Sequence, residues 1–327
     1  MRLTAFSKFL IVLAVVAVAF FGFRYFMSNS SVSKNQDTTT EQKESKSDDN
    51  TQAPNPSSDI ESSFNFTPPA PVNGKLKGVV ELGASGFNSF IVKIDDQKRW
   101  SLSKAEFGSS LVHENMATST DIREGLKNYI AGMLNYGVNG KDIHFVVSSG
   151  ASKSEQVAKI SAELKKLGYV VNPVTPEKEG QLALKCVLPD AYINDAFVVD
   201  IGSSNTKISW MQGDRIKSIE TYGSKYFQNG VTDGKVYDEV EKLASQIPSD
   251  RRLVCFMIGG APFDLAKTHR NGKERYTVLK APDDYQTQEA KTKAGINIYR
   301  ALRNATGCDT FVFDWDSNFT IGFLLTI

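Results

Sequence analysis

Two short segments of the chain place a carboxylate, a glycine and small hydroxyl residues in the same order. Residues 79–85 read Val-Val-Glu-Leu-Gly-Ala-Ser, and residues 198–204 read Val-Val-Asp-Ile-Gly-Ser-Ser. Each apolar run predicts a buried strand that delivers an acid, Glu81 or Asp200, to a glycine turn before a second strand. Glycine lets a ligand approach the backbone closely, and turn amides with serine hydroxyls bind anions. The carboxylate can hold Mg²⁺ or orient a water, so the chemistry indicated is that of phosphate groups.

The duplication of this segment suggests a clamp. Two such turns facing each other would hold a phosphate between two similar halves of the protein. The alternative is two ordinary β-hairpins in an α/β protein, which a single copy would favour, whereas two matched copies favour the clamp. The candidate phosphate-binding residues of the two turns are Gly83, Ser85, Gly202, Ser203 and Ser204.

The segments around these turns follow the same order of strands and helices twice. Strands are expected at residues 76–82, 90–95, 100–102, 143–147, 169–172, 198–201, 206–211, 216–222, 253–258 and 310–313. Helices are expected at residues 120–136, 236–247 and 286–305. Another helix is expected to end at residue 167, and two more are expected to begin at residues 175 and 263. Residues 319–325 close the fold. This order predicts two α/β lobes with a cleft between them.

The N-terminal end differs in composition from the rest. Residues 9–23 are all apolar, and with Arg24 snorkelling the run through Met27 reaches the ~20 residues that a bilayer requires. A cleaved signal peptide is the competing interpretation, but the small-x-small triplet at residues 17–19 lies inside the apolar core rather than after it. We therefore expect residues 1–27 to form a short tip and a transmembrane anchor, and the polar residues 28–73 to form a disordered linker.

Charge gives a weaker indication of location. The tip carries Arg2 and Lys8 without an acid, which favours a cytoplasmic N-terminus and an extracytoplasmic (periplasmic) globular domain on a single-pass membrane protein. The three cysteines lie far apart in apolar surroundings, which is more natural in a reducing compartment, and we give the topology signal more weight. A formal net charge of +1 gives no reason to expect nucleic-acid binding.

From about residue 76 to 327, the chain resembles the actin-like and sugar-kinase ATPase superfamily, and within it the exopolyphosphatase/guanosine-pentaphosphate phosphatase (Ppx/GppA) family. The resemblance lies in the order of five motifs, since each is weak by itself. They are the acid-Leu-Gly loop at 81–85, the Ser-Ser-Gly turn at 148–152, the helix start at 175–182, the Asp-Ile-Gly loop at 200–207, and Gly259-Gly260.

The resemblance implies an α/β fold of two actin-like (ribonuclease H-like) lobes, residues 74–190 and 191–327, around a central cleft. It places Glu179 on the family's general base, which activates water against a terminal phosphate. It places Glu81 and Asp200 on the acids that hold metal or water. Gly259 and Gly260 join the phosphate-binding residues. From the residue alone, Glu179 is equally a solvated acid in the first turn of a helix, and Gly259-Gly260 an ordinary strand-to-helix turn.

Several positions depart from the family pattern, and two of the three glycines of its Asp-Ile-Gly loop are here Ser203 and Ser204. Glu81 stands where the family has Asp, Ser152 where it has a phosphate-binding Arg, and Thr320 where it has the Arg of a closing Arg-Glu-Gly. Lys207 stands where the family has a second acid, which reverses a charge. A lysine there could pair with Glu179 or Asp200 and replace the metal, or it could bind an anion.

These departures leave two functions open. The charge reversal favours a pseudoenzyme that binds or scaffolds in a membrane complex, with other membrane-complex proteins or a phosphate-containing ligand as partners. The alternative is a Mg²⁺-dependent phosphoanhydride hydrolase acting on polyphosphate or a phosphorylated nucleotide. In both cases one cleft is expected to bring together Glu81, Ser85, Glu179, Asp200 and Ser203, with Lys207 reaching toward it.

Overall fold

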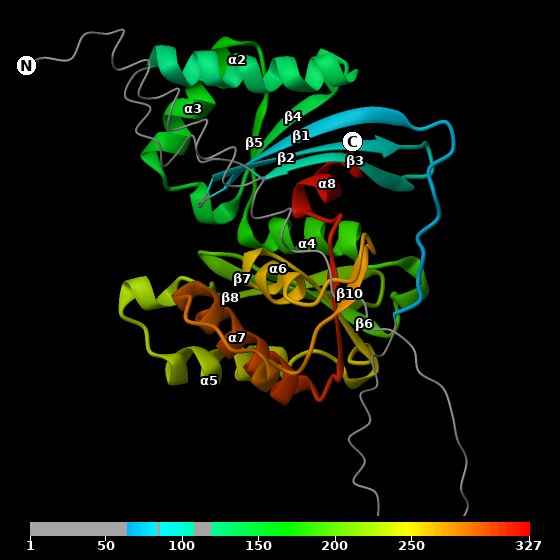
Figure 1. Ribbon diagram of the computed structural model, residues 1–327, viewed down its shortest axis with the longest axis vertical. Coiled ribbons are helices and arrows are strands. Elements are labelled where there is room, and N and C mark those ends of the chain that lie inside the picture. The colour runs from blue at the N-terminus through cyan, green and yellow to red at the C-terminus, as the bar shows by residue number, and fades with distance from the viewer. Residues whose placement is uncertain (1–63, 84–85, 108–118) are drawn as a thin grey trace, which may run out of the picture. The chain divides into compact units, whose positions relative to one another are not determined.

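The computed structural model describes residues 64–83, 86–107 and 119–327 (Figure 1). The expected membrane anchor, most of the expected linker and Ser85 lie outside these residues. Within the described ranges, no helix is both long and apolar enough to cross a bilayer.

The first lobe is built on a five-stranded sheet in the order β3-β2-β1-β4-β5. Its strands are β1 (Lys75–Gly83), β2 (Gly86–Ile94), β3 (Trp100–Phe107), β4 (Ile143–Val147) and β5 (Val171–Pro173). The opening strands β1, β2 and β3 form an antiparallel meander, and β4 and β5 add in parallel beside β1. Two helices, α2 (Ser119–Tyr136) and α3 (Glu155–Lys166), pack on one face of this sheet and share its apolar core.

The second lobe repeats this plan in a six-stranded sheet, in the order β10-β11-β9-β6-β7-β8. Its strands are β6 (Ala196–Ile201), β7 (Asn205–Gln212), β8 (Arg215–Tyr222), β9 (Val254–Ile258), β10 (Tyr276–Val278) and β11 (Thr310–Asp314). Its outer face is covered by α5 (Asp233–Ala244), α6 (Gly260–Lys267) and α7 (Ala290–Thr306). The strands β8-β7-β6-β9 therefore repeat the order β3-β2-β1-β4, which confirms the prediction of two similar α/β lobes.

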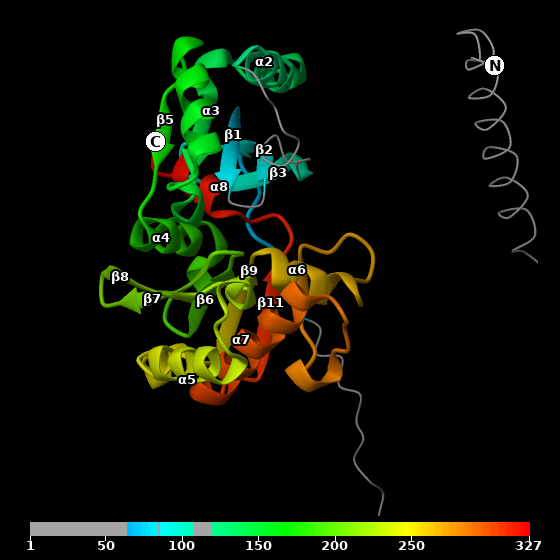
Figure 2. The ribbon, with the colours of Figure 1, turned by 90° about the vertical axis from the view of Figure 1, so that its left-hand side faces the viewer.

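Two helices lie between the sheets, as Figures 1 and 2 show: α4 (Pro176–Val187) and α8 (Phe319–Leu324). Their buried residues join those of both sheets in one apolar cluster. Small residues allow the close packing. A Cβ on Gly180 would lie 2.0 Å from Ser218 Oγ on β8, and one on Gly322 would lie 2.0 Å from the carbonyl oxygen of Leu182. The amino end of α4 is thereby fixed between the lobes.

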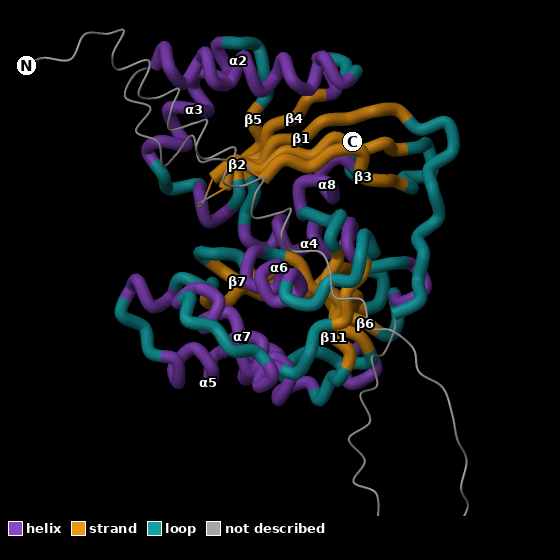
Figure 3. The backbone as a smooth tube through the Cα atoms, viewed as in Figure 1, coloured by secondary structure: helices purple, strands orange, loops and turns teal. Residues whose placement is uncertain are grey.

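Single 3-10 turns connect these elements at Gly140–Asp142, Ser149–Ala151, Asp190–Tyr192, Tyr226–Asn229, Ser249–Arg251 and Pro282–Asp284. The tube in Figure 3 shows the strands of the two sheets with the helix α4 between them. The first lobe was expected to begin at Gly74. Phe64 and Phe66, which precede that residue, already pack against the apolar cluster between the sheets.

Candidate functional site

The turns predicted to bind phosphate meet in one cleft with a volume of about 200 Å³. Its walls are the β1–β2 turn, the β6–β7 turn, the end of β4, the start of α6 and the first turn of α4. Among the predicted residues, those that line it are Glu81, Gly83, Glu179, Asp200, Gly202, Ser203, Ser204, Gly259 and Gly260. Lys207 lines it as well, whereas Ser85 lies outside the described residues. The predicted gathering of these residues around one cleft is thus observed, while their functional roles stay predictions.

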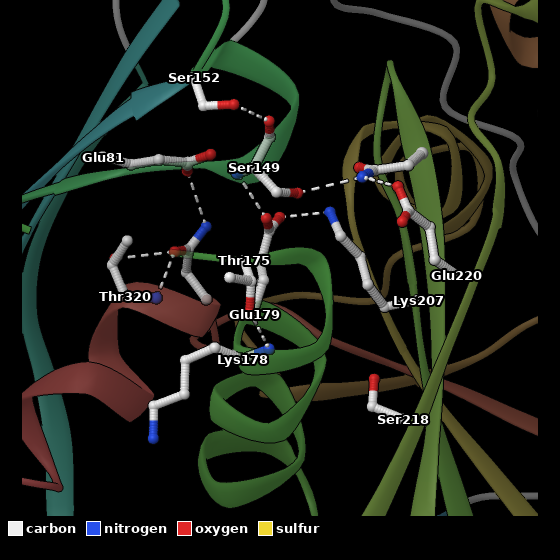
Figure 4. Close-up of polar contacts among 12 residues, drawn as sticks. Glu81, Ser149, Ser152, Thr175, Lys178, Glu179, Lys207, Ser218, Glu220 and Thr320 are labelled. Carbon is white, nitrogen blue, oxygen red and sulfur yellow. Dashed lines mark hydrogen bonds and ion pairs between the residues drawn. The ribbon is translucent and has the colours of Figure 1, made fainter. Parts of the chain in front are cut away.

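Lys207 and Glu179 form a buried ion pair inside this cleft (Figure 4). The Lys207 side chain on β7 is 3% exposed and that of Glu179 on α4 is 4% exposed. Lys207 Nζ donates to Glu179 Oε1, and the backbone N–H of Ser149 donates to Glu179 Oε2 at 2.8 Å. Both oxygens of the candidate general base are therefore already hydrogen-bonded within the protein. The sequence left open whether Lys207 pairs with an acid or binds an anion. In the structure it is paired with Glu179.

Helix capping explains how Glu179 reaches the cleft. Thr175 caps α4 by accepting a hydrogen bond from the backbone N–H of Lys178 at 3.2 Å, and Pro176 occupies the first position of the helix. Glu179 follows in the first turn, where a carboxylate is favoured by the helix dipole. The sequence predicted this helix start correctly.

Glu81 is held by two amide side chains that the sequence did not single out. Its Oε2 accepts hydrogen bonds from Asn88 Nδ2 at 3.0 Å and from Asn318 Nδ2 at 3.1 Å. Burial raises the pKa of Glu81 to about 7, and the nearby charges of Glu179 and Asp200 raise it further against the lowering effect of the two amides. Glu81 is therefore divided between its protonated and ionised forms near neutral pH.

Asn318 is itself oriented by the start of α8. Its Oδ1 accepts from the Thr320 backbone N–H at 2.9 Å and from Thr320 Oγ1 at 2.7 Å, which turns its Nδ2 toward Glu81. Thr320 thus acts on the cleft by fixing Asn318. Ser152, where the resemblance led us to expect an arginine, donates through Oγ to the carbonyl oxygen of Ser149 at 2.8 Å.

Asp200 ends the buried strand β6 beside the α6 turn. Burial raises the pKa of Asp200 to about 6, while Lys207 lowers it and Glu179 raises it. Gly259 makes room for this carboxylate, since a Cβ there would lie 2.9 Å from Asp200 Oδ1 and 2.4 Å from the carbonyl oxygen of Ile201. The φ of Gly259 is also +102°, a value that favours glycine. The glycine therefore has a structural reason to be present besides any contact with phosphate.

The turns of the two lobes touch each other directly. Asn205 Nδ2 donates to Ser149 Oγ at 3.0 Å and to Glu220 Oε1 at 2.6 Å. A Cβ on Gly150 would lie 2.8 Å from the Cβ of Ser204. The first-lobe turn after β4 is therefore packed against the β6–β7 turn and hydrogen-bonded to it, and the cleft is narrow.

The metal-binding role of Glu81 and Asp200 stays a prediction. In the described part of the chain, no group of three or more histidine, cysteine, aspartate or glutamate side chains is placed to hold a metal ion. Glu179 has the cation of Lys207 as its partner, so the carboxylates left for a metal are Glu81 and Asp200. Both have a pKa raised toward neutrality, which weakens them as ligands because a metal competes with the proton.

Comparison with known proteins finds solved structures with a similar fold. No family model and no curated protein matches the chain. Among solved structures, an Aquifex aeolicus member of the Ppx/GppA family is 18% identical, with 77% of this chain and 97% of the other covered at a TM-score of 0.59. The type II variant of the A. aeolicus Ppx/GppA phosphatase is 16% identical, covering 77% and 98% at a TM-score of 0.54. An exopolyphosphatase from Cytophaga hutchinsonii is 13% identical, covering 77% and 97% at a TM-score of 0.59. This chain therefore has the fold of these Ppx/GppA and exopolyphosphatase structures.

Proposed function

We propose that this protein is a membrane-tethered pseudoenzyme, in which the two-lobed phosphatase fold serves for binding or scaffolding in a membrane complex rather than for hydrolysis. The observation that carries the proposal is the buried ion pair between Lys207 and Glu179. A general base must be free to take a proton from the attacking water. Glu179 instead has one oxygen bonded to an ammonium and the other to a backbone amide.

The charges in the cleft support the same function. Phosphoryl transfer requires positive charge around the transferred group and a positioned water. Lys207, which lines the cleft, is paired with Glu179, and the carboxylates of Glu81 and Asp200 would repel a phosphate that brought no cation. The contact between the Gly150 and Ser204 turns also leaves little space between the lobes.

The alternative is a Mg²⁺-dependent phosphohydrolase. It is favoured by the polar, glycine-lined cleft and by a fold that solved exopolyphosphatases share. In that case Glu81 and Asp200 would hold Mg²⁺, which supplies positive charge at the phosphate. The chain's own part would be to orient water through Glu179 once Lys207 had moved away.

Phosphate release decides between the two. The full-length protein in detergent is incubated with polyphosphate, ATP or guanosine pentaphosphate and with Mg²⁺ or Mn²⁺. We expect no release above that of the Glu179→Gln variant, which keeps the shape of the side chain and removes the base. Release that depends on Glu179 would instead establish the hydrolase.

Binding experiments then separate a scaffold from a ligand-binding module. Calorimetric titration with the same compounds is expected to show no metal-dependent micromolar binding if the protein is purely a scaffold. Co-purification of a stoichiometric partner from membranes would support the scaffold.

The membrane part of the proposal concerns residues outside the described structure. The apolar run at residues 9–27 and the basic tip before it support an N-terminus in the cytoplasm and a domain on the other side. Reporter fusions after Ile327 test this. Activity of an enzyme that works only outside the cytoplasm is expected, and activity of a strictly cytoplasmic reporter would reverse the orientation.

A further inference from the structure

The chain segment before β1 packs on the second lobe although it leads into the first (Figure 1). The ring of Phe64 lies 5.4 Å from that of Tyr192, 5.5 Å from Phe256 and 5.4 Å from Tyr276, measured between centroids. Phe66 adds ring contacts to Tyr192 at 5.7 Å and to Tyr276 at 6.0 Å. Since Phe256 is on β9 and Tyr276 on β10, this end of the segment is fixed to the second lobe.

The other end is fixed to the first lobe. The backbone N–H of Val72 donates to Asp95 Oδ2 at 3.0 Å, just before the chain enters β1. Asp95 follows β2, and its side chain is 2% exposed. It is held firmly, because it also accepts from Arg99 Nε at 2.7 Å and from the backbone N–H groups of Gln97 and Arg99. We refer to residues 64–72 as the interlobe strap.

The strap is short and stiff. Residues 68–71 read Pro-Pro-Ala-Pro, and each proline fixes its own φ and restricts the residue before it. Such a segment behaves as a semi-rigid spacer that cannot lengthen to follow a movement of its ends. A rotation of one lobe against the other would change the distance between the aromatic contacts of Phe64 and the hydrogen bond of Val72, so one of the two must break.

The strap also touches a further contact that joins the lobes. The guanidinium of Arg275 lies 4.4 Å from the ring centroid of Trp100 on β3 and 5.2 Å from that of Tyr276. Arg275 is fixed to the second lobe by a paired contact with Asp314 at 3.0 Å. Tyr276 therefore lies between the strap and the Arg275–Trp100 contact, and the three form one connected group.

We propose that the interlobe strap is a latch that holds the two lobes in the arrangement in which the Ser149–Asn205 hydrogen bond closes the cleft. Opening of the cleft then requires release of one end of the strap. The polypeptide that precedes Phe64 enters the domain at this latch, so a partner or a load acting on that polypeptide acts first on the contacts of Phe64 and Phe66. The strap restrains the movement of the lobes whether or not the cleft hydrolyses phosphate.

Spin-label distances between the lobes test the latch in the full-length protein. Labels are placed at Lys127→Cys on α2 and Lys242→Cys on α5, both exposed. The three native cysteines are buried and are not expected to react. We expect a single narrow distance distribution in the otherwise native chain. Releasing the second-lobe end with the double variant Phe64→Ala and Phe66→Ala is expected to broaden it and add a population at changed distance.

A second variant releases the other end with little risk to folding. Val72→Pro removes the N–H that bonds Asp95, at a residue that is 59% exposed and already follows a proline, and it should broaden the distribution in the same way. The matched control is Phe227→Ala, a partly exposed phenylalanine on the second lobe with no interlobe ring contact, and it should leave the distribution unchanged. Native distributions in both strap variants would overturn the proposal, even if the variants melted at a lower temperature, because the strap would then only add stability.

Discussion

Replacing Lys207 by methionine tests the central feature of the cleft. Methionine keeps most of the volume of the lysine stem and removes the charge. In the native protein, Lys207 serves two carboxylates: it is ion-paired with Glu179, and its charge lowers the pKa of Asp200. Lys207→Met therefore leaves two buried acids without a cation, whereas Glu179→Gln leaves Lys207 with Asp200 still nearby.

Because the two variants leave different charges without a partner, they should lower the free energy of unfolding by different amounts. Removing one partner of a buried ion pair costs ~3–5 kcal/mol in the free energy of unfolding. We expect about 3 kcal/mol for Lys207→Met, at the lower end because Glu179 keeps its hydrogen bond from Ser149. Glu179→Gln should cost about 1–2 kcal/mol, since the amide oxygen can still accept that bond and the lysine keeps a partner. The double variant should cost less than the sum of the two by at least about 1 kcal/mol.

Urea unfolding of the native protein, the two single variants and the double variant at pH 7.5 measures these costs. The slope of the free energy of unfolding against urea concentration must be the same in each protein. The cost of Lys207→Met should also shrink at pH 5, because without the lysine the pKa of Asp200 rises further and the folded state takes up a proton that offsets the loss. A larger cost for Glu179→Gln than for Lys207→Met, or additivity of the two variants, would refute the view that this pair is the main stabilising contact of the cleft.

The pKa of Glu81, about 7 in the folded protein, lies above its ordinary value, so the folded state binds more protons than the unfolded state across the pH range between them. The free energy of unfolding should therefore fall on the order of 1–2 kcal/mol from pH 5 to 7.5, and Glu81→Gln should flatten that dependence in urea titrations run at each pH. Gly180→Ala should destabilise by ~1–3 kcal/mol because its Cβ would clash with Ser218 Oγ, whereas Gly234→Ala on α5, with open space around it, should raise the melting temperature slightly. A Gly180→Ala protein as stable as the native one would mean that α4 is free to shift on its sheet.

Sequence patterns predicted the architecture because the two lobes follow local rules. The paired apolar-acid-glycine segments became the β1–β2 and β6–β7 hairpins, and the helix expected at residues 120–136 is α2, Ser119–Tyr136. The helix start at Thr175 and Pro176 was predicted to the residue, whereas the helices expected from residues 236, 263 and 286 begin at Asp233, Gly260 and Ala290. Repetition of the strand order in the second sheet then follows from the repeated order of elements along the chain.

The details of the cleft were not predictable in the same way, because they depend on contacts between distant segments. Asn88, Asn205 and Asn318 occur at unremarkable positions in the sequence, yet each donates a hydrogen bond within or beside the cleft. Their amides matter only because β2, β7 and the start of α8 converge there. For Lys207, alternation along a strand allowed either solvent or cleft, and only the position of α4 against the second sheet decides that it meets Glu179.

The same contacts explain how the cleft keeps its shape without a ligand. In the cleft, Lys207 joins the second sheet to α4, Asn205 joins the β6–β7 turn to Ser149, and Asn318 joins α8 to Glu81. Each of these bonds connects segments that a ligand would otherwise have to hold in place. A cleft that binds a metal and phosphate has unmet charges before its ligands arrive, which costs stability. Here Lys207 balances the charge of Glu179 within the chain, and the contacts between the lobes are made without a ligand. That property is the one expected of the proposed pseudoenzyme, whose surface rather than its cleft would be presented to a partner.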